Sequence, residues 1–195
     1  MTHERAEELE LAQRCSAGDR EAQREFFLRQ RAQVHRTLYR VLGTNRQVED
    51  LIQETFIAAF GALPSFRGES SLATWVDTIA ARVIYRHLAR RAPPPPHLQA
   101  LHTPQADIPD PERELLAREA LRRLYSVLDR IEPAHRIAYT LHVIDGRPMK
   151  EVARITRTTR MAVKNRVWRA RRSLHARALR DPLLSELVMR LKEGT

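Results

Sequence analysis

The chain has 195 residues, a length that suits one or two compact domains, and its 43% hydrophobic share is enough for small cores. Its formal net charge of +10 indicates a polyanionic partner. The single Cys15 excludes a disulfide within the chain, as expected of a reducing cytosol. Only 6 glycines occur and no β-branched run alternates with polar residues, so helices are favoured over sheet. No stretch of about 18 apolar residues predicts a membrane span, and the acidic N-terminus does not have the pattern of a signal peptide.

Residues 7–91 are predicted to form a series of helices. Asp19 is a candidate N-cap of a long helix that ends near Gly43. A second helix is expected to begin after Asn45, with an apolar face made of Val48, Ile52, Phe56, Ala59, Phe60 and Leu63. A loop over 64–70 follows, and Ser71 is expected to cap a third helix with a buried side of Leu72, Val76, Ile79, Ala80 and Val83.

The composition changes at residue 92. Four consecutive prolines at 93–96 cannot continue a helix, and the polar stretch up to Pro109 contains further prolines, so 92–110 is predicted to be a linker. The chain is therefore expected to be all-α, with two small helical domains at 7–91 and 111–180 joined by this Pro-rich linker. A C-terminal tail occupies 181–195.

Proline pairs mark helix starts in the second half. Asp110-Pro111 and Glu132-Pro133 each place a capping residue before a proline at the first helical position. The first of these helices has Leu115, Leu121, Leu124 and Leu128 at helical spacing. The second runs through Ile137, Leu141 and Ile144 and closes at 145–146. Two more are expected at 148–155 and 159–180, then a tail helix at 182–191 that either packs back on the domain or offers a partner surface.

The positive charge is concentrated near the C-terminus. Residues 147–180 hold twelve Lys and Arg against the single acid Glu151, a net +11, so the rest of the chain carries a net −1. Within this segment 148–172 has the layout of a helix-turn-helix, with a buried stripe of Val163, Val167, Ala170 and Leu174 on the second helix. A solvated helix normally mixes charge signs, yet no acid occurs over 152–180. This pattern predicts contact with nucleic acid.

Two smaller patterns lie in the first half. Arg82, Arg86 and Arg90 follow one another at i, i+4 and i+8 beside Trp75, which is typical of a surface for single-stranded nucleic acid; Trp75 is alternatively a core-edge residue. Glu49, Asp50, Gln53 and Glu54 lie opposite the apolar face of their helix. They form a partner-docking face, a solvated face or, least favoured, a metal site, because no His or further carboxylate has a helical offset to complete one.

The combination resembles a known family. Asp50-Leu51-Ile52-Gln53-Glu54-Thr55-Phe56, then Phe66-Arg67-Gly68-Glu69-Ser70-Ser71, then Thr74-Trp75-Val76 with Ile79-Ala80, resemble region 2 of the sigma-70 family in its extracytoplasmic-function (ECF) group. The segment 121–174, which ends in Val163-Lys164-Asn165-Arg166 and Arg169-Ala170-Arg171-Arg172-Ser173-Leu174, is similar to region 4 of that group. Together they cover nearly all of 8–178, in the family's order.

The resemblance implies a sigma factor that binds core RNA polymerase, recognises the −35 and −10 promoter elements, assists promoter melting and directs initiation. The polymerase-binding residues it implies are Asp50, Leu51, Gln53, Glu54 and Phe56. Those for the −10 element are Phe66, Arg67, Glu69, Ser70, Trp75, Arg82, Arg86 and Arg90. Those for the −35 element are Arg157, Thr159, Arg160, Lys164, Asn165 and Arg169.

The resemblance also implies partners and a location. Core RNA polymerase, promoter DNA and an anti-sigma factor are expected to bind this chain. No cofactor, metal, small-molecule substrate or membrane insertion is expected, and the site of action is the bacterial cytoplasm at the nucleoid. An enzyme such as a nuclease or recombinase is disfavoured, because no convergent carboxylates, Gly-rich phosphate loop or HExxH occur in the sequence.

The sequence departs from the family pattern in two places. Arg157 stands where the family usually has Gly in the turn, between Thr156 and Thr158, and would be strained if it takes a positive φ. Arg82 and Arg86 replace the usual Asn and Asp. The irregular turn leaves an alternative open, a sigma-like DNA-binding regulator that does not itself initiate transcription, although the docking motif at 50–56 argues against it.

Overall fold

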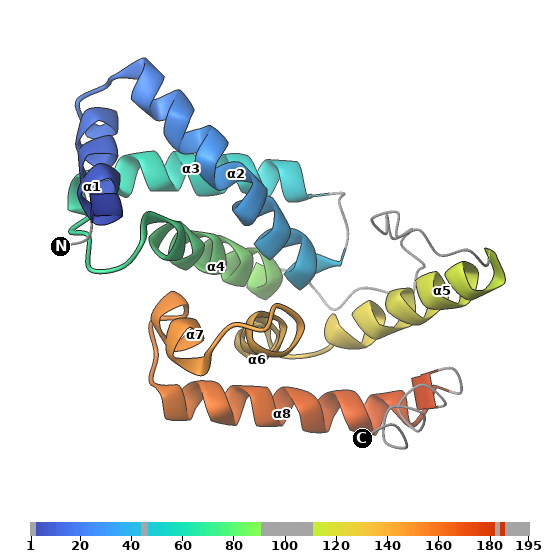
Figure 1. Cartoon of the computed structure of the whole chain (residues 1–195). Helices are drawn as coiled ribbons and strands as arrows, with labels where there is room; N and C mark the ends of the chain where they lie inside the picture. The colour runs from blue at the N-terminus through green and yellow to red at the C-terminus, as the bar shows by residue number, and fades with distance from the viewer. Residues whose placement is uncertain (1–2, 44–46, 91–110, 182–183, 186–195) are drawn as a thin grey trace.

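The computed structural model describes residues 3–43, 47–90, 111–181 and 184–185, and within these ranges all regular structure is helical (Figure 1). The elements are α1 (His3–Ser16), α2 (Arg20–Leu42), α3 (Val48–Ala62), the 3₁₀ turn η1 (Leu63–Ser65), α4 (Leu72–Arg90), α5 (Pro111–Leu128), α6 (Pro133–Tyr139), the π-helical turn η2 (Thr140–Ile144), α7 (Met149–Ile155) and α8 (Arg160–Ala178). None of the described helices combines the length and apolar character needed to cross a bilayer. The predicted linker 92–110, Asn45, Asp110 and most of the predicted tail helix 182–191 lie outside the described residues.

Local capping sets several helix ends, and those predicted at Asp19, Gly43 and Ser71 are confirmed. The Asp19 carboxylate accepts hydrogen bonds from the N–H groups of Glu21 and Ala22 at 2.9 and 3.1 Å. Gly43 has φ 72° and donates its N–H to the carbonyl of Tyr39, which closes α2. Ser71 Oγ accepts from the N–H of Thr74 at the start of α4. The first helix begins at His3, four residues before the predicted boundary.

The helix after Glu132 differs from the prediction. It is α-helical only to Tyr139, and a π turn follows in which the N–H of Asp145 donates to the carbonyl of Thr140 at 2.8 Å. The wider turn inserts an extra residue and rotates the side chains that follow. Ile144, predicted as part of the apolar series of this helix, is 38% exposed. Leu115, predicted as part of the apolar series of α5, is also exposed, at 69%.

Helix α4 lies in the middle of the molecule. It packs against α2 and α3 on one side and against α6 and α7 on the other, while α8 forms the outer layer beneath α6 and α7 (Figure 1). The helix that carries Trp75, Arg82, Arg86 and Arg90 of the predicted −10 residues therefore also packs against both halves.

The larger of two apolar clusters is shared by the two halves. A continuous cluster of buried side chains runs from Leu11 in α1 to Val167 in α8, and it includes Ile84 of α4, Ile137 of α6 and Val152 of α7. Hydrophobicity patterns along the sequence identify each half but carry no information about this packing of one half on the other.

Arg147 is the centre of a polar cluster that crosses between the halves. Its guanidinium lies 2.5 Å from the carboxylate of Asp77 on α4, which is fully buried, and 2.5 Å from that of Asp145. It also pairs with Glu151 at 3.2 Å and donates to the Thr37 hydroxyl on α2 at 3.1 Å. A buried carboxylate is tolerated only when it is paired, so Asp77 and Arg147 depend on each other.

Arg136 makes a second connection. It is 1% exposed, forms an ion pair with Asp129, and donates to the carbonyls of Val41 and Leu42 at the end of α2, at 2.8 and 3.1 Å. These are the orphan carbonyls of a helix C-terminus, which favour a nearby cation.

Tyr125 of α5 adds a third connection to the same helix end. Burial raises the pKa of Tyr125 to about 12, so its hydroxyl stays protonated and donates to the Arg40 carbonyl at 2.9 Å. Its ring lies over Gly43, where an added Cβ would come within 2.1 Å of the ring carbons.

Candidate nucleic-acid interface

The helix-turn-helix forms as predicted, with α7, a tight turn and α8. Arg157 has φ 48°, the left-handed conformation that strains a non-glycine residue by about 1–2 kcal/mol. The turn is held by hydrogen bonds from the N–H of Thr158 to the Ala153 carbonyl and from the N–H of Arg157 to the Arg154 carbonyl, at 2.9 and 3.2 Å. Thr159 caps α8 by accepting from the N–H of Ala162.

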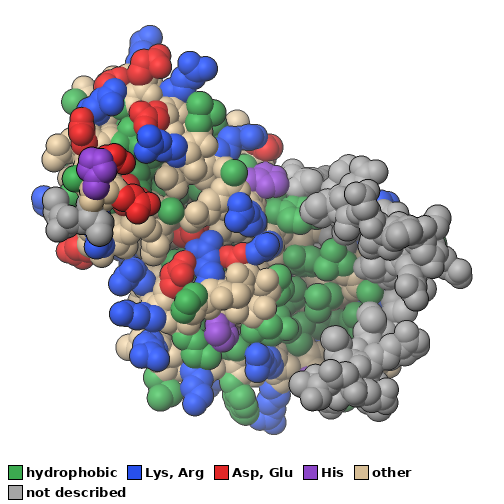
Figure 2. All heavy atoms as spheres, viewed as in Figure 1, with side chains coloured by type: hydrophobic (Ala, Val, Ile, Leu, Met, Phe, Trp, Pro, Cys, Tyr) green, Lys and Arg blue, Asp and Glu red, His purple; other side chains and the backbone are tan. Residues whose placement is uncertain are grey.

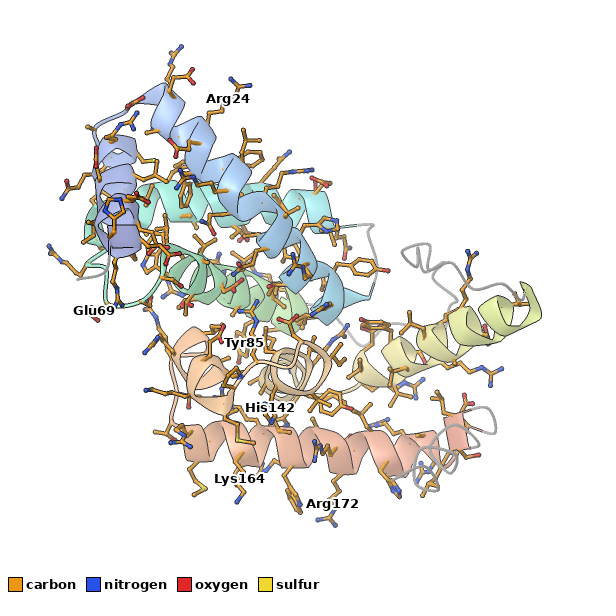
Figure 3. The ribbon with its side chains drawn as sticks, in the orientation of Figure 1. Arg24, Glu69, Tyr85, His142, Lys164 and Arg172 are labelled. Atoms are coloured by element: carbon orange, nitrogen blue, oxygen red, sulfur yellow. The ribbon has the colours of Figure 1, made fainter. Side chains whose placement is uncertain are left out.

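The buried stripe of α8 determines which residues face outward. Val163, Val167, Ala170 and Leu174 are buried against α6, α7 and α5, as predicted from their spacing. The residues predicted to contact the −35 element are all exposed: Arg157, Thr159, Arg160, Lys164, Asn165 and Arg169. Figure 2 shows Lys and Arg side chains along the edge formed by α8, and Lys164 and Arg172 point away from the body of the molecule in Figure 3.

This surface is basic without local compensation. Four of the predicted −35 residues are positively charged, and none of them forms an ion pair within 4.0 Å across the described ranges: Arg157, Arg160, Lys164 and Arg169. Exposed cations without local acids are available to bind phosphates. Arg147, which sequence counting groups with them, is 12% exposed and belongs instead to the cluster around Asp77.

The arginine stripe of α4 has a mixed environment. Arg82, Arg86 and Arg90 are exposed, but Arg86 pairs with Glu54 of α3 at 2.8 Å, with both side chains about half exposed. Trp75 is partly buried and packs edge-on against Phe66, with ring centroids 5.4 Å apart. Of the two interpretations of Trp75, the structure places it at the edge of the core, beside the arginine stripe.

The loop before α4 is supported by α1, a contact that sequence reasoning missed. Glu8 accepts a hydrogen bond from the N–H of Leu72 at 3.0 Å, and the Leu9 side chain lies against Gly68, which has φ 68°. Phe66 is 8% exposed and anchors the loop to the apolar core. The other predicted −10 residues of this loop are Arg67 and Glu69, which are exposed, and Ser70, which is partly exposed.

The predicted polymerase-binding residues divide into two groups. Asp50, Gln53 and Glu54 are exposed on one side of α3. Leu51 and Phe56 are buried, at 4% and 3% exposed, and can act only by holding the helix in place. Phe56 does so through ring contacts with Phe26, Phe27 and Phe60.

Ile57 is a residue of this face that the sequence prediction missed. It is 73% exposed, and its offsets of seven, four and three residues from Asp50, Gln53 and Glu54 place it on the same side of α3. Its exposure could have been predicted, because it falls outside the apolar spacing of the helix. Among the described residues, no group of three or more His, Cys, Asp or Glu gathers as metal ligands would.

Comparisons with known proteins agree with this geometry. The family models for sigma-70 region 2 and sigma-70 region 4 match residues 26–93 and 121–174. The ECF RNA polymerase sigma-E factor of Haemophilus influenzae is 29% identical over 170 residues, which cover 83% of this chain and 89% of that protein. The fold is similar to that in the structure of CnrH in complex with the cytosolic domain of CnrY, with a TM-score of 0.62 and 22% identity, over 89% of this chain and 98% of that one.

A second solved structure shares the fold. The sigma factor RpoE of Bartonella quintana, in complex with the anti-sigma factor NepR, has a TM-score of 0.56 and 21% identity, over 78% of this chain and 94% of that one. The two region models together span more than half of the chain, in the order in which the two helical halves occur. The chain therefore belongs to the sigma-70 family of transcription initiation factors, in its ECF group.

Proposed function

We propose that this sigma factor divides its work among three surfaces: α3 binds core RNA polymerase, α4 with its preceding loop contacts the −10 element, and α8 contacts the −35 element. The proposed domain boundaries are those predicted from the sequence: region 2 in 7–91, the linker in 92–110 and region 4 in 111–180. The observation that carries the proposal is the difference between two exposed surfaces. α8 presents Lys and Arg side chains along its outer edge (Figure 2), whereas α3 presents Asp50, Gln53 and Glu54, the last of these paired with Arg86, and two such surfaces suit different macromolecules.

The −35 contact rests on α8. In a helix-turn-helix the N-terminal part of the second helix enters the major groove. Arg160 and Lys164 lie one turn apart there and are exposed, so they can reach base edges or nearby phosphates. Arg169, further along, suits a phosphate contact, and Arg157 places a guanidinium beside the start of the helix.

The −10 contact combines a loop with a basic helix. Arg67 and Glu69 are exposed on a loop held by α1, and Arg82 and Arg90 continue along α4. Unpairing bases costs a few kcal/mol, and a loop that traps an unstacked base together with arginines that bind the backbone offsets this cost. Trp75 edges the core and lies where a base could stack at the margin of the loop.

The acidic face of α3 is proposed to dock on the polymerase. Asp50, Gln53 and Glu54 lie on the same side of α3 as Ile57, so the face combines polar groups with one exposed apolar side chain, a combination that protein interfaces use. An anti-sigma factor is proposed as a further partner, since one of the solved sigma factors with this fold is held by such a protein.

Promoter binding by both halves requires them to separate. Arg82 of α4 and Arg157 of the turn line one cavity between the halves, although the proposal assigns them to two different promoter elements. We therefore infer that the structure is a closed form of the protein and that engagement of polymerase and promoter breaks the contact between Arg147 and Asp77.

Run-off transcription with purified core polymerase on a genomic promoter library tests the proposal. We expect transcripts from a set of promoters that share a −35 and a −10 sequence, and we expect a Lys164→Ala variant to bind core normally but to use those promoters poorly. Binding to core without any transcript would instead indicate a sigma-like regulator.

A further inference from the structure

A cavity of about 500 Å³ lies between the two halves of the protein. Its lining comes from α4, from the start of α6, from the turn after α7 and from α8, and it includes Arg82, Tyr85, Arg157 and Arg166. Figure 3 shows Tyr85 on the side of α4 that faces the α6–α7 layer. The volume falls within the usual range of small-molecule sites.

Three arginines, drawn from both halves, line this cavity. Within the described part of the chain, Arg82, Arg157 and Arg166 form no ion pair within 4.0 Å, whereas Arg147, which does not line the cavity, contacts three carboxylates. Like charges held in one cavity repel each other, and a bound anion would relieve this repulsion.

The one acid in the lining does not neutralise the arginines. The carboxylate of Glu132 accepts hydrogen bonds from the N–H groups of Ala134 and His135, at 3.1 and 3.0 Å, as the N-cap of α6. It also lies 3.4 Å from the His135 ring. The cavity therefore keeps a net positive charge, because Glu132 is one acid against three arginines.

The remainder of the lining suits a planar ring. Tyr85 is 45% exposed and lies three residues after Arg82, on the same side of α4. Ile137 and Ile155 supply an apolar wall at the same cavity. An aromatic ring with an apolar wall beside arginines is the chemistry that holds a base through stacking and its phosphates through charge.

We propose that this cavity binds a nucleoside polyphosphate, with its base against Tyr85 and its phosphates among Arg82, Arg157 and Arg166. Such a ligand touches both halves at once and so stabilises the closed form. If the proposed promoter contacts of Arg82 and Arg157 hold, the ligand also competes with promoter DNA. That consequence rests on the proposed function, whereas binding to the cavity does not.

Isothermal titration calorimetry on the full chain, without polymerase or DNA, tests the site by itself. The probes are ATP, GTP, inorganic tripolyphosphate, and guanosine as a ligand without phosphate. We expect saturable binding of ATP or GTP with one site per chain. Guanosine should bind at least about tenfold more weakly than GTP, because it cannot form the charge-assisted hydrogen bonds of the phosphates. Absence of saturable nucleotide binding would overturn the proposal.

Variants separate the cavity from general positive charge. Arg157→Asn removes the guanidinium while keeping a residue that tolerates positive φ, and Arg166→Gln removes a second one. Each substitution should lower the affinity for ATP or GTP about tenfold. Arg154 is exposed and lies outside the cavity, so Arg154→Gln should leave this affinity unchanged. Arg82→Gln on the exposed face of α4 replaces Arg157→Asn if that variant does not fold.

Further outcomes address the alternatives. Tyr85→Leu should lower the affinity for ATP or GTP but leave the affinity for tripolyphosphate unchanged. An unchanged nucleotide affinity would reject the stacking role of Tyr85. An equal loss in Arg154→Gln would show that binding is non-specific charge attraction and would overturn the site. A short single-stranded oligonucleotide that binds through Arg157 and Arg166, when nucleotides do not bind, would assign the cavity to DNA instead.

Discussion

Arginine has a different role at the boundary between the two halves and on the outer face of α8. Arg147 is 12% exposed, and its guanidinium contacts the carboxylates of Asp77, Asp145 and Glu151. Arg160 on α8 is exposed and, within the described residues, pairs with no acid within 4.0 Å. The number of arginines in a segment therefore does not measure its DNA-binding surface, because burial and acids from distant parts of the chain decide which charges remain available.

The largest expected effect separates these two kinds of cation. Arg147→Ala leaves the buried Asp77 carboxylate without its guanidinium, which should lower the free energy of unfolding by about 3–5 kcal/mol. Lys164→Ala, on the exposed face, should change it by less than about 0.5 kcal/mol. Urea denaturation followed by circular dichroism measures both. Similar losses in the two variants would contradict the distinction.

The contact between the halves at Gly43 gives the next effect. Gly43→Ala combines a left-handed φ with a clash against the Tyr125 ring, and should destabilise the protein by about 2–4 kcal/mol. Gly146 has a similar φ of 70°, but a Cβ added there would meet no atom within 4 Å. Gly146→Ala should therefore lower the free energy of unfolding by only about 1 kcal/mol. Thermal unfolding of the pair isolates the contribution of the clash. Equal losses would show that Tyr125 moves aside without penalty.

Exposed apolar residues provide a third comparison. Ile57→Ala should weaken binding to core polymerase by about 1–2 kcal/mol, because Ile57 is the exposed apolar side chain of the proposed docking face. Leu115→Ala removes a similarly exposed apolar side chain, 69% exposed on α5, and should leave that affinity unchanged. Fluorescence anisotropy with labelled protein measures both. Equal weakening would indicate that the acidic face of α3 is not the docking surface.

The smallest effect concerns the ion pair between Arg86 and Glu54. Both side chains are about half exposed, so a double-mutant cycle with Arg86→Ala and Glu54→Ala should give a coupling free energy below about 1 kcal/mol. The Glu54→Ala variant should nevertheless lower core binding, and the Arg86→Ala variant should lower binding to a single-stranded −10 oligonucleotide. A coupling as large as that of the Arg147 cluster would mean that the pair is a structural link.

The local features of the fold could be predicted from the sequence. Asp19, Gly43, Ser71 and Glu132 mark helix ends through hydrogen bonds to backbone groups only a few residues away, so the residue type and its position were sufficient. The buried stripe of α8 followed from spacing alone, since side chains three and four residues apart share a helix face. The π turn at 140–144 was missed, because no residue type or spacing in this segment marks it.

The candidate sites were predicted in part. Residue types and spacing identified the exposed residues of α3 and α8, since a polar side chain opposite an apolar stripe faces solvent wherever the helix packs. Only the tertiary structure determined that Arg147 and Arg136 are interior links, that Glu8 caps α4, and that Arg82 and Arg157 meet at one cavity. These contacts join residues that are many positions apart in the sequence. Hydrophobic periodicity predicts which face of a helix is buried, but it does not predict which distant helix packs against that face.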